Sequence, residues 1–590
     1  MGLGMTDYGW HIYRGNIKQV SIGNGVADIG SSAFEQCDSL TSISIPNSVT
    51  SIGSGAFALC TSLTNITLPN SITRISRKMF YKCISLKNII LPENITSIDE
   101  KAFYECRSLM TVNLPDSVTA IGSYAFFDCV SLKNVLLGNS VTDIGYRAFA
   151  SCISLTSIAL PDGMTSICEG AFHGCASLTN VVIPNSVTSI GKSAFSGCSA
   201  LTEVVIPDSV SFIDCFAFSY CRLLTSITLP ESMTNIDEFV FYYCESLTNI
   251  TLGDNITKIG SCEFKGCKAL KRITLPKGVV SIETAAFAEC TSLSCVIISS
   301  SVTDIKSNAF KECSSLTSIV LPKDLKTISG WTFCKCTALH SITIPQSVTN
   351  IDNMAFYSCT ALTDVYYGGT EEQWREISVG VGNSYLISAT IHYNSPMPVA
   401  GFTDVYEHNW FLNAVETVTG RKIMNGTGNG EFAPDSYFTR AQAAQVVYNM
   451  GADGQRIPNG GFSDVGSHWG AVAINWAAAN EIVSGLPNGQ FAPDENITRR
   501  DLTIVLYNYA KWKGWDVSDT AELSGFLDSA DVPNWAASYL RWAVDKGILN
   551  GSTSGGKRYL KPNDTATRAE VAAMLALFQQ NVVNAQNISA

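Results

Sequence analysis

The hydrophobic positions of the first two thirds of the chain recur with a fixed period of 23 residues. A phenylalanine occurs at fifteen positions, from Phe34 to Phe356, and a cysteine follows each one after three residues. A leucine follows each cysteine after three more, from Leu40 to Leu362. A period of this length is typical of a solenoid, in which each copy buries its apolar face only against its neighbours.

Within one copy the pattern predicts short strands joined by turns. Ile66 and Leu68 alternate with polar residues, which indicates a strand with one buried face. A proline then ends the strand, and Ile72 and Ile75 belong to a second extended piece. We expect the stretch 79–83 to form a tight helical turn. Stacked at about 4.8 Å per strand, fifteen copies predict a parallel β-solenoid on the order of 70 Å long.

The repeated core, I-P-x-S-V-T-x-I-G-x-x-A-F-x-x-C-x-x-L-T-x-I, resembles the BspA-like subclass of leucine-rich repeats, which occur on bacterial surfaces. The resemblance covers roughly residues 15 to 393. The segment from Val365 to Trp374 departs from the repeat, and we interpret it as part of a terminal cap over the last open strand edge. The solenoid domain is therefore assigned to residues 1–393, with its cap from about residue 365.

The chain has twenty cysteines, and fifteen of them form the periodic column from Cys37 to Cys359. A zinc site needs thiolates that converge, which one cysteine every 23 residues does not provide. Stacked side chains also keep their Cβ atoms about 4.8 Å apart, instead of the roughly 3.8 Å of a disulfide. We therefore interpret the column as free, buried cysteines, and we expect no metal or other cofactor.

The outward strand positions, where a ligand of the solenoid would bind, are mostly small and polar. Thr41, Ser42 and Ser44 in one copy and Thr225 in another are examples. Such a surface suits many weak hydrogen bonds to a protein or a glycan. It suits equally well a solvated face without a ligand, and both interpretations stay open.

After residue 394 the period ends, and a different unit occurs three times. Each copy has a Phe-x-Asp element, a tryptophan before an apolar periodic helix, a turn with glycine, and a Thr-Arg pair that opens a second helix. In copy order, the residues of these elements are Asp404, Asp464 and Asp528; Trp410, Trp469 and Trp535; Gly426, Gly485 and Gly551; and Arg440, Arg499 and Arg568.

The Thr-Arg element predicts a helix N-terminus. The threonine and the residue three positions later suit a capping box, most completely in Thr567 and Glu570. Capping does not explain the arginine, because positive charge at the first helical position opposes the helix dipole. An arginine beside free helix N–H groups would form an anion site. The alternative is an arginine paired with a neighbouring aspartate.

These three copies resemble S-layer-homology repeats over roughly residues 400 to 580. The resemblance implies an all-α, three-lobed bundle whose grooves bind secondary cell-wall polysaccharide, often through a pyruvate ketal on an amino sugar. It implies that the twelve residues above form the binding sites, with glycines that let the backbone approach the sugar. We assign residues 394–400 to a linker, and 401–459, 460–524 and 525–590 to the three repeats. The third repeat lacks the F-x-P-D loop residues of the first two.

Composition and motifs narrow the function further. The net charge of −12 argues against a nucleic-acid partner, and no apolar stretch reaches the roughly 18 to 20 residues that span a membrane. The six histidines lack the spacing of a metal-binding helix, and no nucleophile or phosphate-loop motif is present, so we expect no enzyme. The segment from Met1 to Tyr8 does not resemble a secretory signal.

The sequence thus predicts a secreted, non-catalytic protein of the bacterial cell surface, cell wall or S-layer, whose signal peptide is absent from this sequence. The C-terminal repeats would bind wall polysaccharide, and the solenoid would present a protein- or glycan-binding surface, as an adhesin does. The alternative is a structural S-layer or cell-wall coat protein without a specific solenoid ligand. A coat protein should assemble into sheets, whereas an adhesin should bind its target as a monomer.

Overall fold

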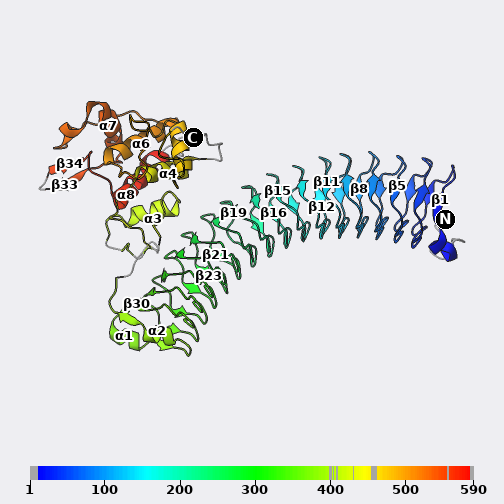
Figure 1. Cartoon of the computed structure of the whole chain (residues 1–590), viewed down its shortest axis with the longest axis horizontal. Coiled ribbons are helices and arrows are strands. Elements are labelled where there is room, and N and C mark those ends of the chain that lie inside the picture. The colour runs from blue at the N-terminus through cyan, green and yellow to red at the C-terminus, as the bar shows by residue number, and fades with distance from the viewer. Residues whose placement is uncertain are drawn as a thin grey trace. The chain divides into compact units, whose positions relative to one another are not determined.

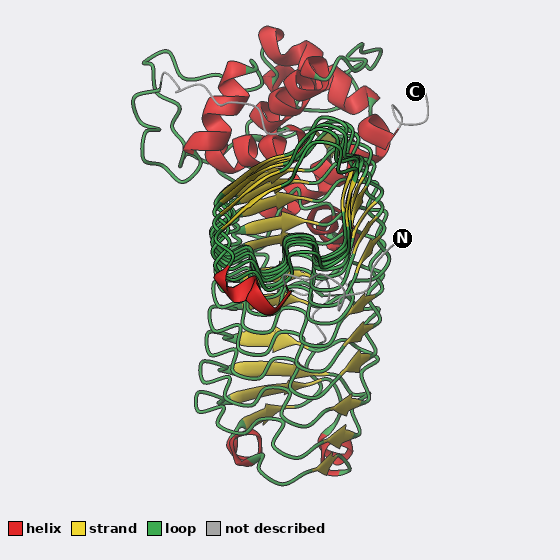
Figure 2. Cartoon of the chain, turned by 90° about the vertical axis from the view of Figure 1, so that its right-hand side faces the viewer, coloured by secondary structure: helices red, strands yellow, loops and turns green. Residues whose placement is uncertain are grey.

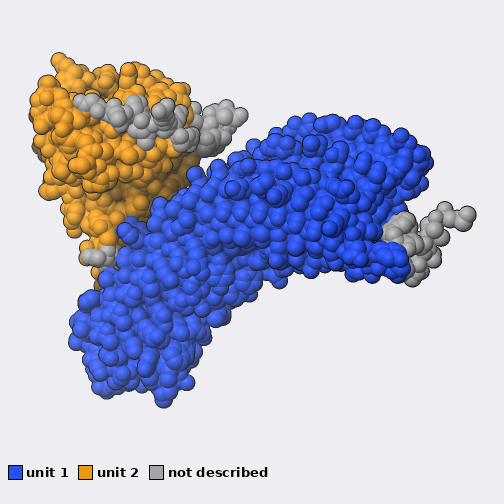
Figure 3. All heavy atoms as spheres, turned by 45° about the vertical axis from the view of Figure 1, so that its right-hand side comes forward, with its two compact units in different colours: residues 1–395 blue, residues 396–590 orange. Residues whose placement is uncertain are grey.

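The computed structural model describes residues 11–396, 402, 404–406, 409–428, 431–452, 462–554 and 557–584. The segment from Met1 to Tyr8 and residues 397–400 of the predicted linker lie outside the described residues. The chain divides into two compact units, residues 1–395 and 396–590, which are coloured separately in Figure 3.

Unit 1 is a parallel β-solenoid in which nearly every 23-residue copy contributes two short strands (Figure 1). The strands form two rows, and most of them pair in parallel with the strand 23 residues later, as Asn65 with Asn88 and Arg74 with Ser97. Viewed end-on, the two rows flank a common interior and loops connect them (Figure 2). The solenoid fold predicted from the period is therefore confirmed.

The two rows differ in strand length, and a short helix, η1 (His11–Asn16), precedes them. The first row consists of β1 (Gln19–Ser21), β3 (Ser42–Ser44), β5 (Asn65–Thr67), β7 (Asn88–Ile90), β9 (Thr111–Asn113), β11 (Asn134–Leu136), β13 (Ser157–Ala159), β15 (Asn180–Val182), β17 (Glu203–Val205), β19 (Ser226–Thr228), β20 (Asn249–Thr251), β22 (Arg272–Thr274), β24 (Cys295–Ile297), β26 (Ser318–Val320), β28 (Ser341–Ile344), β30 (Asp364–Tyr367) and β32 (Thr390–His392). The second row consists of β2 (Asp28–Ile29), β4 (Ser51–Ile52), β6 (Arg74–Ile75), β8 (Ser97–Ile98), β10 (Ala120–Ile121), β12 (Asp143–Ile144), β14 (Ser166–Ile167), β16 (Ser189–Ile190), β18 (Phe212–Ile213), β21 (Lys258–Ile259), β23 (Ser281–Ile282), β25 (Asp304–Ile305), β27 (Thr327–Ile328), β29 (Asn350–Ile351) and β31 (Ser378–Val379).

The phenylalanine column fills the interior of unit 1. From Phe34 to Phe356 the rings stack with centroids 5.0 to 6.0 Å apart. Strand residues such as Ile66 and Leu68 are buried in the same continuous core. Because no copy has a core of its own, the contact between copies supplies the hydrophobic stabilisation.

The cysteine column also forms hydrogen bonds. All twenty cysteines are free, and the fifteen of the column are buried, as predicted. From Cys60 to Cys359, each Sγ donates to the carbonyl of the phenylalanine in the preceding copy, at 3.1 to 3.4 Å. Burial raises the pKa of Cys83 and Cys175 to about 12, so these thiols keep the proton that they donate. The periodic pattern predicts only an apolar column, and this hydrogen-bonding role of the thiols does not follow from it.

The turn around each phenylalanine adds a third set of hydrogen bonds between copies. The amide of Phe126 donates to the carbonyl of Ala148 at 2.8 Å, and the amide of Asp128 donates to that of Ala150 at 2.9 Å. Tyr124 and Asp128 have positive φ, 57° in both, and the corresponding residues of most other copies do too. These left-handed residues turn alternate amides toward the next copy, so the turn joins copies as the strands do.

The residues after β30 close the last open face of unit 1. β32 pairs with β30, and β31 pairs with β29. Two short helices, α1 (Glu371–Arg375) and α2 (Ser384–Ser388), lie between these strands. The side chain of Asn383 accepts from the amide of Phe356 and donates to the carbonyl of Asp352, both at 2.9 Å. It thus satisfies backbone groups that a further copy would otherwise bind.

The second row is interrupted between β18 and β21. The register places residues 235–236 there, and they do not form a strand. In the next copy, Glu263 occupies the buried position that alanine holds in most copies, and neither carboxyl oxygen has a well-formed hydrogen bond. Burial, and then the charge of Asp237, raise the pKa of Glu263 well above its usual range, and Val240 and Lys258 offset this only in part. An acid with a raised pKa therefore lies in the core close to the interruption.

Unit 2 is a helical assembly in which each of three copies contributes two helices. These are α3 (Leu412–Gly420) and α4 (Arg440–Gly451), α5 (Ala471–Ala479) and α6 (Arg499–Trp512), and α7 (Ala537–Asp545) and α8 (Arg568–Phe578). The third copy also contains two 3-10 turns and a hairpin, and a π-helical turn follows α8: η2 (Ser529–Asp531), η3 (Asn534–Ala536), β33 (Ser552–Ser554), β34 (Lys557–Tyr559) and η4 (Gln579–Val583). Among the described residues, no helix has the length and apolar character that crossing a membrane requires.

Three segments, one from each copy, meet inside unit 2. The amide of Phe438 donates to the carbonyl of Ala566, the amide of Ala566 to that of Ile497, and the amide of Ile497 to that of Phe438, at 2.8 to 3.0 Å. These bonds form a closed ring of three buried residues. Each segment leads directly into a Thr-Arg element, so the ring fixes the starting positions of α4, α6 and α8.

Candidate functional site: the grooves between the C-terminal repeats

The helices α4, α6 and α8 begin with the threonine caps that the sequence predicts. The side chain of Thr567 accepts from the amide of Glu570 at 3.3 Å, and Oε2 of Glu570 accepts from the amide of Thr567 at 2.9 Å. Thr439 and Gln442 form the same capping box, so glutamine replaces the acid without loss of the cap. Thr498 caps α6 with its side chain.

The prediction that these helices offer free N–H groups to an anion is wrong. The amides of Arg440 and Ala441 donate to the carbonyls of Glu495 and Pro493, both at 2.9 Å. The corresponding amides of α6 donate to carbonyls of residues 564 and 562, and those of α8 to carbonyls of residues 436 and 434. The loop of another copy therefore occupies each helix N-terminus, which leaves the arginine side chain as the cationic group.

Arg440 extends from the first copy to the second. Its Nε and Nη2 donate to the carbonyls of Phe491 at 2.8 Å and Ser484 at 2.9 Å. The guanidinium lies 4.7 Å from the centroid of the Phe491 ring. Burial lowers the pKa of Arg440, and the charge of Asp501 partly offsets this. The alternative, in which the arginine pairs with a neighbouring aspartate, is therefore only part of the observed arrangement. Two backbone carbonyls bind the Arg440 guanidinium directly.

Arg568 makes the same pair of contacts, from the third copy to the first. Its Nε and Nη2 donate to the carbonyls of Phe432 at 2.7 Å and Asn425 at 2.6 Å, and its guanidinium lies 4.9 Å from the centroid of the Phe432 ring. The third copy therefore binds back to the first, and the three copies form a closed cycle.

Arg499, which extends from the second copy to the third, has different partners. Its Nε donates to the carbonyl of Leu560 at 3.3 Å, and its Nη1 forms an ion pair with Oε1 of Glu570 at 3.0 Å. Leu560 stands where the other two copies have a phenylalanine, so Arg499 has no ring beneath it at this position. The three arginines of one motif therefore lie in two kinds of surroundings.

The three aspartates bind backbone amides of the loop that carries the arginine-binding carbonyl. Asp464 accepts from the amides of Phe491 at 2.9 Å and Ala492 at 2.7 Å, and Ala492 has a positive φ of 55°. These backbone hydrogen bonds hold the pKa of Asp464 below its usual range. Asp404 and Asp528 make the corresponding two bonds. The aspartates thus position the loop and are already satisfied by protein donors.

The three glycines allow the phenylalanine of the Phe-x-Asp element to pack against the turn. A Cβ atom on Gly485 would lie 2.3 Å from the ring of Phe462, and one on Gly426 or Gly551 would lie 2.7 Å from the corresponding ring. The space that the sequence analysis reserved for a sugar is therefore filled by a side chain of the same copy. The residue before each glycine supplies a carbonyl that an arginine binds.

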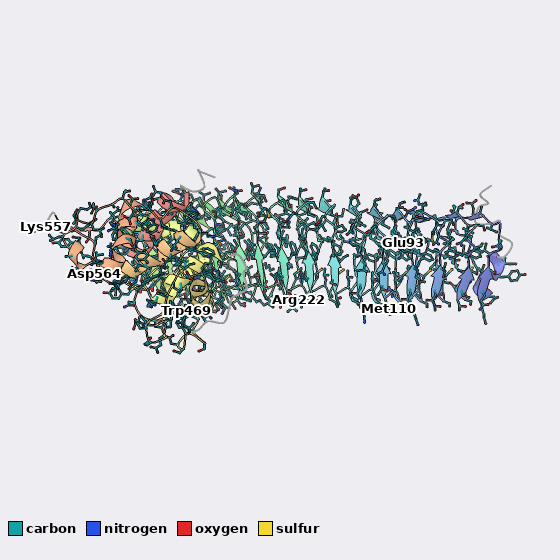
Figure 4. The ribbon with its side chains drawn as sticks, turned by 90° about the horizontal axis from the view of Figure 1, so that it is seen from above. Glu93, Met110, Arg222, Trp469, Lys557 and Asp564 are labelled. Carbon is teal, nitrogen blue, oxygen red and sulfur yellow. The ribbon has the colours of Figure 1, made fainter. Side chains whose placement is uncertain are left out.

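The three tryptophans are largely exposed: Trp410 by 69%, and Trp469 and Trp535 by 61% each. The side chain of Trp469 is labelled in Figure 4. Trp535 lines a pocket of about 280 Å³ together with Arg440 and Ser484. The pocket thus combines an arginine of the first copy, a turn of the second and a tryptophan of the third.

Sequence reasoning missed further residues of this pocket. Asn508 of α6 and Tyr539 of α7 line it, and neither belongs to a recurrent motif. Helical spacing could have identified both, since Tyr539 follows Trp535 by four residues and Asn508 follows Asp501 by seven. Within the described ranges, no group of three or more histidine, cysteine, aspartate or glutamate side chains is arranged to hold a metal ion.

The outward face of the first strand row has fewer available hydroxyl donors than the sequence suggests. The side chain of Thr225, for example, donates to the carbonyl 23 residues earlier at 3.2 Å. Aliphatic side chains are more prominent on this face: Ile90 is 81% exposed, Leu136 63%, and Val182 and Val205 68% each. These four residues hold the same strand position in four of six successive copies, with Asn113 and Ala159 in the other two, and we refer to the four as the apolar lane. The sequence pattern did not predict it, although each of the four follows its buried strand residue directly.

The chain matches two known families. Residues 11–133, 119–247 and 234–363 match the BspA type leucine rich repeat region, and residues 401–444, 461–503 and 525–572 match the S-layer homology domain. The crystal structure of a leucine-rich repeat protein from Bacteroides ovatus is similar at 31% identity and a TM-score of 0.50, over 64% of this chain and 91% of that chain.

Three relatives match between 26% and 36% of this chain. The Surface-layer 125 kDa protein of Lysinibacillus sphaericus is 29% identical over 33% of this chain and 16% of its own length. The Cellulosome-anchoring protein of Acetivibrio thermocellus is 29% identical over 26% of this chain and 34% of its own length. An Amylopullulanase of Thermoanaerobacterium thermosulfurigenes is 28% identical over 36% of this chain and 11% of its own length. The chain therefore spans about a third or less of the length of these three relatives.

Both matched families are non-catalytic surface domains, although some relatives with S-layer homology domains bear enzyme names. The repeat family covers residues 11 to 363, which is more than half of the chain. The chain therefore belongs to the BspA type leucine rich repeat family and, with its three S-layer homology domains, is a cell-surface protein.

Proposed function

We propose that this protein is a non-catalytic, wall-anchored adhesin. In this proposal unit 2 binds secondary cell-wall polysaccharide through anionic groups such as pyruvate ketals, and unit 1 presents a surface for another protein. The pocket of about 280 Å³ beside Arg440 carries the anchoring part, because it combines a cation, an exposed aromatic ring and polar groups from all three copies.

The chemistry of this pocket suits an anionic sugar. The Arg440 guanidinium has five N–H donors, and the carbonyls of Phe491 and Ser484 accept from its Nε and Nη2, so Nη1 remains for a carboxylate. The exposed face of Trp535 suits the apolar face of a sugar ring, and Asn508 adds an amide. We propose that the arginines and tryptophans contact the ligand, whereas the aspartates and glycines position the loops.

Binding of the full chain to purified cell-wall polysaccharide tests the anchoring. A charge-assisted bond contributes about 1.5 to 3 kcal/mol, so we expect Arg440→Ala to weaken binding roughly 10- to 150-fold. Arg440→Lys should recover part of the loss, because an ammonium keeps the charge but cannot bind the carbonyls of Phe491 and Ser484 and the carboxylate in the same geometry. Arg541→Ala is the control, since Arg541 pairs with Asp519 outside the pocket. Equal affinity of Arg440→Ala and the parent would contradict the proposal.

The apolar lane supports the adhesin part of the proposal. Four large aliphatic side chains on one strand row, each more than 60% exposed, are typical of a surface that a protein partner covers. Capture of host or microbial surface proteins by the full chain should fall when Ile90 and Leu136 are both changed to Ser. If the full chain instead assembles into sheets without a target, the coat-protein alternative is favoured.

A further inference from the structure

The apolar lane of unit 1 alternates longer and shorter side chains along the first strand row. Ile90, Leu136 and Val182 lie two copies apart, and the exposed Asn113 and Ala159 hold the same strand position in the copies between them. Neighbouring strands of a sheet lie about 4.8 Å apart, so the long aliphatic side chains recur about every 9.6 Å. They form ridges with a shorter side chain between each pair.

The support beneath the lane is regular. The strands from β5 to β20 form one nine-stranded sheet, and Figure 1 shows this part of unit 1 from β5 to β19. Thr67 and Thr228 hold the strand position of the lane in the copies before and after it. The lane therefore spans six copies, about 24 Å along the stack, and ends at a polar residue on each side.

Opposite charges lie on the two sides of the lane. Lys87 and Lys133 each precede a residue of the lane by three positions, and both are exposed. Glu93, Asp116 and Asp162 each follow the same strand position by three residues, at the turn where the chain leaves the strand, and they are exposed too. A partner that complements both sides needs acidic groups on one flank and basic groups on the other.

An amphipathic α-helix that lies along the lane matches this pattern. Residues seven positions apart in a helix are separated by about 10.5 Å along its axis, so apolar side chains with that spacing fit between successive ridges when the helix is slightly tilted. About sixteen residues of helix cover the lane. An extended proline-rich segment fits less well, because the grooves that bind such segments are lined by aromatic residues and the lane is aliphatic.

We propose that the apolar lane binds an amphipathic α-helix of a partner protein. Aliphatic residues recur every seven positions in this helix, its acidic flank lies beside Lys87 and Lys133, and its basic flank lies beside Glu93 and Asp116. A helix in the reverse direction would bring its acidic flank to the acidic turns, so the charges also select the direction of binding. This inference rests on the proposed function, because it names the kind of partner that the lane binds.

Binding of a designed helix to the full chain tests this inference. The probe is a monomeric, fluorescein-labelled peptide of three heptads, with leucine at the a and d positions, glutamate on one flank and lysine on the other. Titration followed by fluorescence anisotropy should show saturable binding to the parent. The same peptide with one central residue changed to proline should bind at least about tenfold more weakly, because proline breaks the helix.

Two variants of the chain locate the binding site. Leu136→Ser should weaken binding of the helical peptide roughly tenfold or more, because it removes a large apolar side chain from the contact. Ala159→Glu should weaken binding as well, because it fills the space between two ridges. Ser44→Glu is the matched control, since Ser44 is exposed at the same strand position two copies before Ile90, and it should bind like the parent.

The outcomes separate this inference from the proposed function. No binding of the helical peptide, equal binding of the proline peptide, or parent-like binding by folded Leu136→Ser and Ala159→Glu would overturn the inference. Capture of surface proteins that still depends on Ile90 and Leu136 would then leave the adhesin function standing with another kind of partner. A dimer of the full chain that Leu136→Ser dissociates would show that a second copy covers the lane, and would also overturn the inference. Loss of both peptide binding and protein capture by the parent would overturn the two proposals together.

Discussion

Both units are built by repetition, but unit 1 stacks its copies along a line and unit 2 closes three copies into a ring. In unit 1 each inner copy has the same kind of neighbour on both sides, so a recurrent residue has recurrent surroundings, as the thiol-to-carbonyl distances of 3.1 to 3.4 Å show. In unit 2 each interface is a separate structure. Arg440 and Arg499 hold the same motif position and still have different partners. A repeated motif thus predicts repeated chemistry more safely in a solenoid than in a ring.

The largest expected effect comes from breaking the register of unit 1. Deleting Ala200 would shift the buried positions Leu201 and Val204 by one residue and turn apolar side chains outward. Several core contacts would be lost together, so we expect destabilisation by more than about 4 kcal/mol, measured by calorimetric melting.

The matched control is the deletion of one whole period, residues 185–207. This change shortens the stack but restores the same contacts between the flanking copies, so unit 1 should still melt cooperatively and near the parent temperature. An unchanged melting temperature for the Ala200 deletion would show that the assigned register is wrong.

Much of unit 1 could be predicted because burial there is a property of the position in the period. The fifteen-fold recurrence of Phe and Cys identified the core and the free thiols without any structure. The donor role of the thiol could not be predicted, because it depends on where the phenylalanine carbonyl of the preceding copy points. The apolar lane of Ile90 and Leu136 depends on strand direction in the same way.

The candidate site could be predicted only as a set of positions. The motifs identified Arg440, Asp464, Gly485 and Trp535 as candidate binding residues, and the structure shows that the tryptophans are exposed. Their roles arise from contacts between copies. The loops that occupy the helix N-termini come from another copy, and Arg558, which binds the carbonyl before Gly551, comes from an insertion without a motif. Spacing within one copy contains no information about these partners.

An intermediate effect is expected from the loop of the third copy that Asp528 binds. Asp528 accepts from the amides of Leu560 and Lys561, and Asp528→Asn would place an amide group against one of these donors. A bond to a charged group contributes about 1.5 to 3 kcal/mol, so we expect a loss of about 2 kcal/mol in unit 2. Denaturant unfolding followed by tryptophan fluorescence measures it. Asp531→Asn, at an exposed position, is the control. Equal stability of the two variants would show that the hydrogen bonds of Asp528 do not stabilise unit 2.

A smaller effect is expected from Glu263, which is buried close to the interruption of the second strand row. Burial raises the pKa of Glu263 in the folded chain well above its usual range, whereas the pKa of a glutamate in the unfolded chain is about 4.3. Between these two pKa values the folded chain holds a proton that the unfolded chain has released. The contribution of Glu263 to the stability of unit 1 should therefore be greatest at low pH and fall by up to about 1.4 kcal/mol per pH unit as the pH rises between these two pKa values.

Glu263→Ala, which restores the residue of most copies, should remove this slope and stabilise unit 1 at pH 8. Melting curves from pH 5 to pH 8 measure the change, and the exposed Glu203→Ala should keep the slope of the parent. The same slope in Glu263→Ala and the parent would show that Glu263 does not titrate on unfolding.

The smallest expected effect concerns a single thiol bond. Cys198 donates to the carbonyl of Phe172 at 3.3 Å, whereas Cys37 precedes every other copy and has no column phenylalanine before it. Both side chains are fully buried, so Cys198→Ala and Cys37→Ala remove similar apolar contacts. The alanine at position 198 should cost about 1 kcal/mol more, because it also removes a buried hydrogen bond. Denaturant unfolding measures both losses of stability. Equal losses would mean that the thiols contribute only packing and that their hydrogen bonds to the phenylalanine carbonyls do not stabilise the solenoid.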